Sequence, residues 1–130
     1  DFEEDMRRIA HRMMEGYDYS ITVEGENQIA KLTPLRRADL FLFYKECLVN
    51  ISRHAEADSF QARVEAGQRT LTMTITDNGR GIGDDPIPPS IERRAKMLRA
   101  KLRIKSPVDD AGQGTRIILT IPIRIWRPFF

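Results

Sequence analysis

Four polar side chains recur along a largely apolar stretch of the sequence: Glu46, Asn50, Arg53 and His54. Because each helical residue turns about 100°, the first three would share one narrow stripe of a helix, with His54 at its side. A carboxylate and an amide oxygen one turn apart are hard ligands that suit Mg²⁺, and Arg53 and His54 could meet phosphate oxygens. The same spacing also fits a solvated helix edge with an ordinary Glu/Asn pair.

The helix that carries these residues is predicted over residues 35–55, after Pro34. Its apolar side chains form a second stripe, roughly a third of a turn from the polar one: Leu40, Phe43, Cys47, Ile51 and Ala55. The polar row therefore borders the buried face, which is where a helix flanks a cleft. Cys47 belongs to the apolar stripe, so we expect a small core residue rather than a nucleophile.

A second segment with chemical potential is TITDNGRGIG, residues 74–83. Asp77 ends a predicted strand and could accept a hydrogen bond from an exocyclic amine such as that of adenine. Gly79 and Gly81 leave room for a planar ligand, and their free N–H groups could face a polyphosphate. Asp-Asn-Gly is also a frequent tight-turn sequence that needs no ligand. The segment matches neither the dinucleotide fingerprint nor the phosphate loop that ends in Gly-Lys-Ser/Thr.

The third segment is GQGTRIILTIP, residues 112–122. Gly112 and Gly114 lead into a strand that is predicted to begin at Thr115. A glycine-containing turn before an edge strand would account for this pattern without a ligand.

The elements that must position these segments follow from periodicity and turn residues. Helices are predicted over residues 2–16, 35–55 and 90–100, the last capped by Ser90. Strands are predicted over residues 20–24, 60–65, 70–76, 101–105 and 115–123. Residues 66–69 would form a hairpin, and residues 77–89 are rich in turn signals. The expected fold class is α/β: a two-layer sandwich with a mixed, largely antiparallel sheet and helices on one face.

Composition excludes several other classes of protein. The chain has 130 residues, 41% hydrophobic and 31% charged, which indicates one globular domain over residues 1–130. A net charge of +2, with scattered basic residues, argues against a nucleic-acid surface and a membrane-binding run. One cysteine excludes an internal disulfide and fits a reducing compartment. Since the sequence opens at Asp1 in a charged helical pattern, we expect a fragment of a longer protein.

In combination, the three segments resemble the ATP-binding superfamily of histidine kinases, gyrase, Hsp90 and MutL, which has the Bergerat fold. The order is Glu-x-x-x-Asn-x-x-x-His, then Asp-x-Gly-x-Gly, then Gly-x-Gly-Thr. Within this superfamily the chain is similar to two-component sensor kinases of the nitrate-sensor and lipid-desaturase-sensor type. That similarity rests on three stretches: KECLVNISRHAEAD, IERRAKMLRAKLRIKS and GQGTRIILTIP.

The resemblance implies catalytic and metal-binding roles for Glu46 and Asn50, with Asn50 as the Mg²⁺ ligand. It implies contacts to ATP for a larger set of residues: Asn50, Arg53, His54, Asp77, Gly79, Gly81, Gly112, Gly114 and Thr115. Within this set, Asp77 would bind the adenine amine and Thr115 would support it.

The reaction that the resemblance implies passes the γ-phosphoryl group of ATP to a histidine on a separate dimerisation domain. A response-regulator aspartate would then receive it. The full-length protein would be a homodimer, with this domain in the cytoplasm. The fragment alone would not autophosphorylate, since the dimerisation domain is absent. His11 lies too close to the first predicted strand to be the phosphorylated histidine, and we expect it on the surface of the first helix.

The sequence departs from the family pattern in the predicted lid, residues 84–90, which lacks the usual glycines and contains three prolines. Two other functions therefore stay open: a protein-interaction module with a decayed nucleotide site, and a related serine kinase that inhibits a sigma factor. The C-terminal side chains Trp126, Phe129 and Phe130 form an apolar tail that could dock on the core or on a partner.

Overall fold

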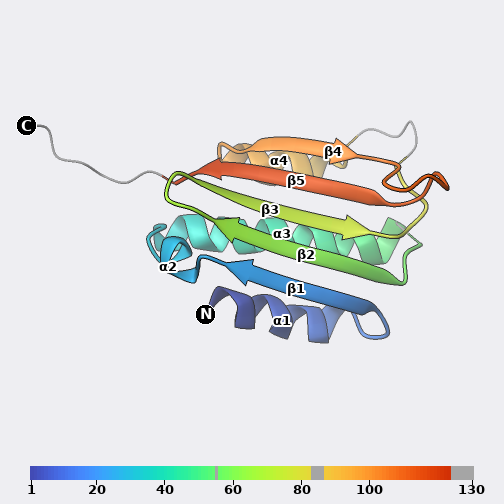
Figure 1. Cartoon of the computed structure of the whole chain (residues 1–130), viewed down its shortest axis with the longest axis horizontal. Helices are drawn as coiled ribbons and strands as arrows, with labels where there is room; N and C mark the ends of the chain where they lie inside the picture. The colour runs from blue at the N-terminus through green and yellow to red at the C-terminus, as the bar shows by residue number, and fades with distance from the viewer. Residues whose placement is uncertain (55, 83–86, 124–130) are drawn as a thin grey trace, which may run out of the picture.

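One mixed sheet forms a layer of the structure, and helices cover one of its faces (Figure 1). The computed structural model describes residues 1–54, 56–82 and 87–123. Within these ranges five strands lie in the order β1-β2-β3-β5-β4. Their bounds are β1 Asp18–Glu24, β2 Ser59–Ala66, β3 Thr70–Asp77, β4 Lys101–Lys105 and β5 Thr115–Pro122. Only β1 and β2 pair in parallel, and the other neighbours are antiparallel, so the predicted mixed, largely antiparallel sheet is confirmed.

The helical layer is built around one long central helix. The helices are α1 Phe2–Met13, α2 Glu26–Ile29, α3 Pro34–His54 and α4 Pro89–Met97. In Figure 1, α3 and α4 lie behind the sheet, and α3 contacts both α1 and α4. Among the described residues, none of the helices has both the length and the apolar character that a membrane span requires.

The core lies between the two layers because both contribute apolar faces with the expected period. On β3 the side chains of Leu71, Met73 and Ile75 are buried, and the threonines between them are half-buried on the opposite face. On β5 the same alternation buries Ile117, Leu119 and Ile121. The apolar stripe of α3 is buried as predicted through Leu40, Phe43, Cys47 and Ile51.

Among the strands of the described residues, β4 occupies one edge of the sheet and pairs with β5. Its alternation leaves Lys101, Arg103 and Lys105 exposed on the face away from the helices, while Leu102 and Ile104 pack against the core.

Several details of the secondary structure differ from the prediction, and α4 also ends earlier than predicted, at Met97. Helix α1 ends at Met13 and β1 begins at Asp18, both earlier in the chain than predicted. The four-residue helix α2 is too short to show a period, so the sequence pattern did not reveal it. Ser90 is not the cap of α4, because Pro88 holds that position. A proline at the first helical position needs no N–H partner and has the right φ, so Pro89 starts the helix one residue earlier.

Two predictions about single side chains are confirmed, and others lie outside the described residues. Cys47 is fully buried, and burial raises the pKa of its thiol well above the usual value, so it is a poor nucleophile. His11 lies exposed on α1. Ala55, residues 83–86, and the tail residues Trp126, Phe129 and Phe130 lie outside the described residues.

A buried hydrogen bond fastens α1 to α3. The Tyr44 hydroxyl donates to the backbone carbonyl of Met6 at 2.8 Å, and both side chains are fully buried. Burial raises the pKa of this phenol, so its hydroxyl stays protonated as a donor at neutral pH.

Tyr44→Phe is expected to lower the free energy of unfolding by about 1 kcal/mol, because it removes this hydrogen bond and keeps the ring. Urea unfolding monitored by circular dichroism measures the change. Tyr19→Phe is the matched control. The ring centroids of Tyr19 and Phe60 lie 5.2 Å apart in a stacked arrangement, and no hydrogen bond to the Tyr19 hydroxyl is found in the described part of the chain. Equal stability of wild type and Tyr44→Phe would contradict a stabilising role for the bond.

Candidate functional site

A cavity of about 330 Å³ opens where the C-terminal half of α3 meets the loop after β3, the start of α4 and the start of β5. This volume lies in the range of small-molecule sites. Among the described residues, thirteen line it: Glu46, Val49, Asn50, Arg53, His54, Asp77, Arg80, Gly81, Ile82, Pro88, Pro89, Ser90 and Thr115. They come from segments that are far apart in the sequence, so only the folded chain forms this cavity.

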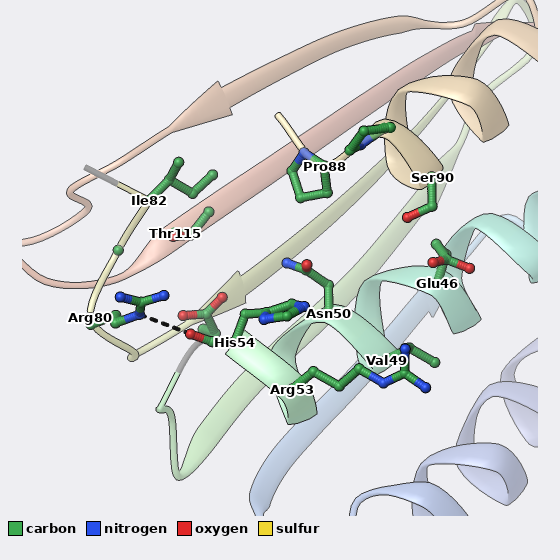
Figure 2. A pocket seen from close by; sticks show the side chains of 13 residues that line it. Glu46, Val49, Asn50, Arg53, His54, Arg80, Ile82, Pro88, Ser90 and Thr115 are labelled. Atoms are coloured by element: carbon green, nitrogen blue, oxygen red, sulfur yellow. Dashed lines mark hydrogen bonds between the residues drawn. The ribbon is translucent and has the colours of Figure 1, made fainter. Parts of the chain in front are cut away.

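Helix α3 supplies one wall of the cavity with its predicted polar row: Glu46, Asn50, Arg53 and His54. Figure 2 shows Glu46 and Asn50 on the side of α3 that faces Pro88 and Ser90. Buried residues such as Cys47 and Ile51 hold the neighbouring stripe of the helix against the sheet. The polar row therefore borders the core and faces the cavity, as the sequence predicts.

The pairing of β3 with β5 places the acidic residue of the site. Asp77 ends β3 directly opposite Thr115, the first residue of β5, and both are buried, with 7% and 6% of their surface exposed. One carboxylate oxygen, Oδ1, accepts a hydrogen bond from the Gly79 N–H at 2.8 Å. A carboxylate has further acceptor capacity on its second oxygen, which a ligand amine could use.

Burial raises the pKa of Asp77 above its ordinary value, since the charged form loses hydration. Hydrogen bonding from the backbone N–H groups of Gly79 and Thr115 opposes this shift and favours the ionised form. Asp77 is thus a desolvated acceptor in a cavity, which is a frequent property of functional carboxylates.

The glycines of the two loops have different roles in the geometry. Gly81 lines the cavity at a φ of +83°, and Gly79 contacts the Asp77 carboxylate through its N–H. Gly114, at a φ of +91°, packs so closely that a Cβ would lie 2.9 Å from the Asp77 carbonyl oxygen. Its N–H donates to the Gly79 carbonyl at 2.8 Å, which joins the two loops.

The structure brings most of the predicted site residues together, but not all of them line the cavity. Those that line it are Glu46, Asn50, Arg53, His54, Asp77, Gly81 and Thr115. Gly79 and Gly114 do not line it, but Gly79 donates to the Asp77 carboxylate and Gly114 donates to the Gly79 carbonyl. Gly112 lies in the turn between β4 and β5, where an added Cβ would meet no heavy atom within 4 Å.

Three lining residues were given no role from the sequence, namely Val49, Arg80 and Ile82, whereas Pro88, Pro89 and Ser90 belong to the predicted lid. The Arg80 Nε donates to the His54 backbone carbonyl at 2.9 Å, so this side chain bridges the glycine loop and the end of α3 (Figure 2). Ile82 and Val49 add apolar surface, while Pro88, Pro89 and Ser90 come from the start of α4. The position of Arg80 between two glycines is the only sequence signal that could have drawn attention to it.

The cavity wall combines acidic, basic and apolar side chains. Basic side chains of Arg53 and Arg80 lie in its wall together with the acceptor Asp77. Among the described residues, no cluster of three or more His, Cys, Asp or Glu side chains could hold a metal ion. Glu46 and Asn50 offer two oxygen-bearing side chains, so a hard cation bound there would take its other ligands from water or from a bound molecule.

The chain is similar to known proteins in part of its sequence and in its fold. No protein-family profile matches the chain. A 90-residue segment, 65% of the chain, is 31% identical to the signal transduction histidine-protein kinase/phosphatase DegS of Brevibacillus brevis. The match spans only 22% of the length of that protein.

Solved structures of histidine kinase domains share the fold. The ATP-binding domain of PrrB from Mycobacterium tuberculosis superposes with a TM-score of 0.67 at 16% identity, over 96% of this chain and 93% of that domain. The histidine kinase domain of the E. coli osmosensor EnvZ gives a TM-score of 0.65 at 11% identity, over 96% and 88%. The chain thus has the fold of the ATP-binding catalytic domains of histidine kinases, and in sequence it is similar to a segment of one such sensor kinase.

Proposed function

We propose that the chain is the ATP-binding catalytic domain of a sensor histidine kinase, which binds Mg-ATP and supplies the γ-phosphoryl group to a histidine on a separate dimerisation domain. The observation that carries this proposal is the convergence of Asp77 with Glu46 and Asn50 on one cavity, from two elements with no local connection. The nitrate-sensor and desaturase-sensor subtype is part of the proposal, as are a homodimeric parent protein, a response-regulator partner and a cytoplasmic location.

In this proposal, residues at the ends of β3 and β5 bind the adenine base. Asp77 would accept the exocyclic amine of adenine, because its Oδ1 is already oriented by Gly79 and its buried setting strengthens a hydrogen bond. Thr115, directly opposite on β5, would support the same edge of the base. Gly81 has no side chain to obstruct the ring.

In this proposal, residues of α3 bind the magnesium ion, and their oxygen atoms fit an ion that arrives with the nucleotide. Asn50 offers an amide oxygen as ligand, and Glu46, one turn away, would hold the ion or its waters. When bound, Mg²⁺ would neutralise charge that develops on the phosphates. Arg53 and His54 lie one further turn along and would orient the phosphate oxygens.

The domain needs no nucleophile of its own for this reaction. Phosphoryl transfer depends mainly on positioning and charge neutralisation, and the acceptor in the proposed reaction is a histidine of another domain. The thiol of Cys47 is fully buried, and it does not line the cavity.

A second candidate function is a protein-interaction module with a decayed nucleotide site. The observation that favours it is the presence of Pro88 and Pro89 in the cavity wall, where they stiffen the start of α4. The third candidate, a serine kinase that inhibits a sigma factor, has less support, because the sequence match is to a histidine kinase.

Mg-ATP is expected to raise the melting temperature of the domain. At a free ligand concentration of 100 times Kd, binding would stabilise the folded state by about 2.7 kcal/mol. Asp77→Asn should weaken ATP binding about ten- to a hundredfold, since it removes a charged acceptor, and should leave the fold intact because it removes a buried charge. Isothermal titration calorimetry measures the affinity, with exposed Asp18→Asn as the control. Absence of any nucleotide binding by wild type would favour the interaction module instead.

Asn50→Ala is expected to weaken binding of ATP with Mg²⁺ more than binding of ATP in EDTA, about tenfold against twofold, because only the first uses the amide ligand. Titrations under both conditions give the ratio. Asn27→Ala, in the exposed part of α2, is the control and should change neither value. Equal losses with and without the metal would rule out Asn50 as its ligand.

A further inference from the structure

The hydroxyl of Ser106 lies where the two glycine loops of the site meet. Ser106 follows the last residue of β4, and it does not line the cavity itself. Its Oγ accepts a hydrogen bond from the Ile82 N–H at 2.9 Å and donates one to the Gly114 carbonyl at 3.0 Å. One side chain thus bonds to the backbone of both loops.

The same oxygen also lies 3.4 Å from the Oγ1 of Thr115, the buried neighbour of Asp77. A hydroxyl has one donor and two acceptor positions. With the Gly114 carbonyl, the Ile82 N–H and the Thr115 hydroxyl around it, the hydrogen-bonding capacity of Ser106 is filled. A residue that could not form these bonds would leave the partly buried N–H of Ile82 without its acceptor.

Steric contact adds to the hydrogen bonds at this point. A Cβ on Gly81 would lie 2.8 Å from the Ser106 Oγ, so the hydroxyl packs directly against the bare Cα of that glycine. Gly81 lines the cavity and has a φ of +83°. The path of the loop past the cavity is therefore set by contact with Ser106 as well as by the bond to Ile82.

The only other direct bond found between the loops, within the described residues, joins the Gly114 N–H to the Gly79 carbonyl. That bond fixes the loop near Asp77, at one end of the segment 77–82. The bond from Ile82 to Ser106 fixes it at the other end. Between them lie Arg80 and Gly81, which both line the cavity.

We propose that Ser106 is a positioning residue of the nucleotide site: its hydroxyl holds the loop of residues 79–82 and the loop that ends at Gly114 in the geometry that accepts ATP. The inference rests on the proposed function for the identity of the ligand. The positioning of the loops themselves does not depend on it.

The first test measures the loops without nucleotide, by amide hydrogen exchange resolved at single residues. Ser106→Ala should raise the exchange rate of the Ile82 amide about fivefold, the effect of one lost hydrogen bond, and should leave the central strands unchanged. Ser52→Ala is the matched control, because the Ser52 hydroxyl also donates to a backbone carbonyl, that of Val49 at 2.8 Å, on an exposed surface. An unchanged exchange rate at Ile82 overturns the proposal.

The second test measures Mg-ATP affinity by calorimetry at a temperature where every variant is folded. Ser106→Ala should weaken binding about tenfold, Ser106→Cys should behave similarly because a thiol is a weak hydrogen-bonding group, and Ser106→Thr should restore binding. Ser106→Cys also serves if the alanine variant does not fold. A lower melting temperature with unchanged affinity would show a merely structural role and overturn the proposal.

The two tests separate failure of this inference from failure of the proposed function. If wild type binds no nucleotide, the proposed function is wrong, and the exchange of Ile82 still decides whether Ser106 positions the loops. If wild type binds Mg-ATP and the alanine variant binds equally well, the proposed function stands and the role of Ser106 is rejected.

Discussion

The register between β3 and β5 is the constraint on which the rest of the site depends. It places Asp77 opposite Thr115, and it is specified by the burial of alternate side chains on both strands. A slip of β3 by one residue against β5 would turn Met73 out of the core and would carry Asp77 to the other face of the sheet. The register that buries the apolar side chains of these strands is therefore the same register that positions Asp77.

Two adjoining stripes of side chains on helix α3 have different functions. Its apolar stripe packs on the sheet, and the row from Glu46 to His54 faces the cavity. Since the rows share one rigid helix, the packing of residues such as Cys47 and Ile51 also determines where Asn50 points. The Arg80 contact to the His54 carbonyl then links the end of this helix to the glycine loop. Rigid elements thus hold each wall of the site.

Much of this arrangement is readable from sequence because it follows from local periods. The strict alternation in β3 and β5 and the stripes of α3 predict the layers and the positions of Asp77 and Asn50. The directions of loop residues are not local properties. Gly81 and Gly112 look alike in sequence, but only the first lines the cavity. The bond of Ser106 to Ile82 joins residues 24 positions apart, and no periodic pattern contains it. Likewise, the two prolines ahead of Ser90 outweigh its capping preference.

The charged edge of the sheet has a consequence for association between copies of the chain. Within the described residues, strand β4 has no partner along its outer side, and the backbone groups of such an edge are a template for another strand. Two copies that met along this edge would bring Lys101, Arg103 and Lys105 close to the same three cations of the other copy. Their mutual repulsion opposes extension of the sheet from one molecule to the next. Because these side chains are exposed, dissolved salt screens their repulsion. The screening length is about 10 Å at 0.1 M ionic strength.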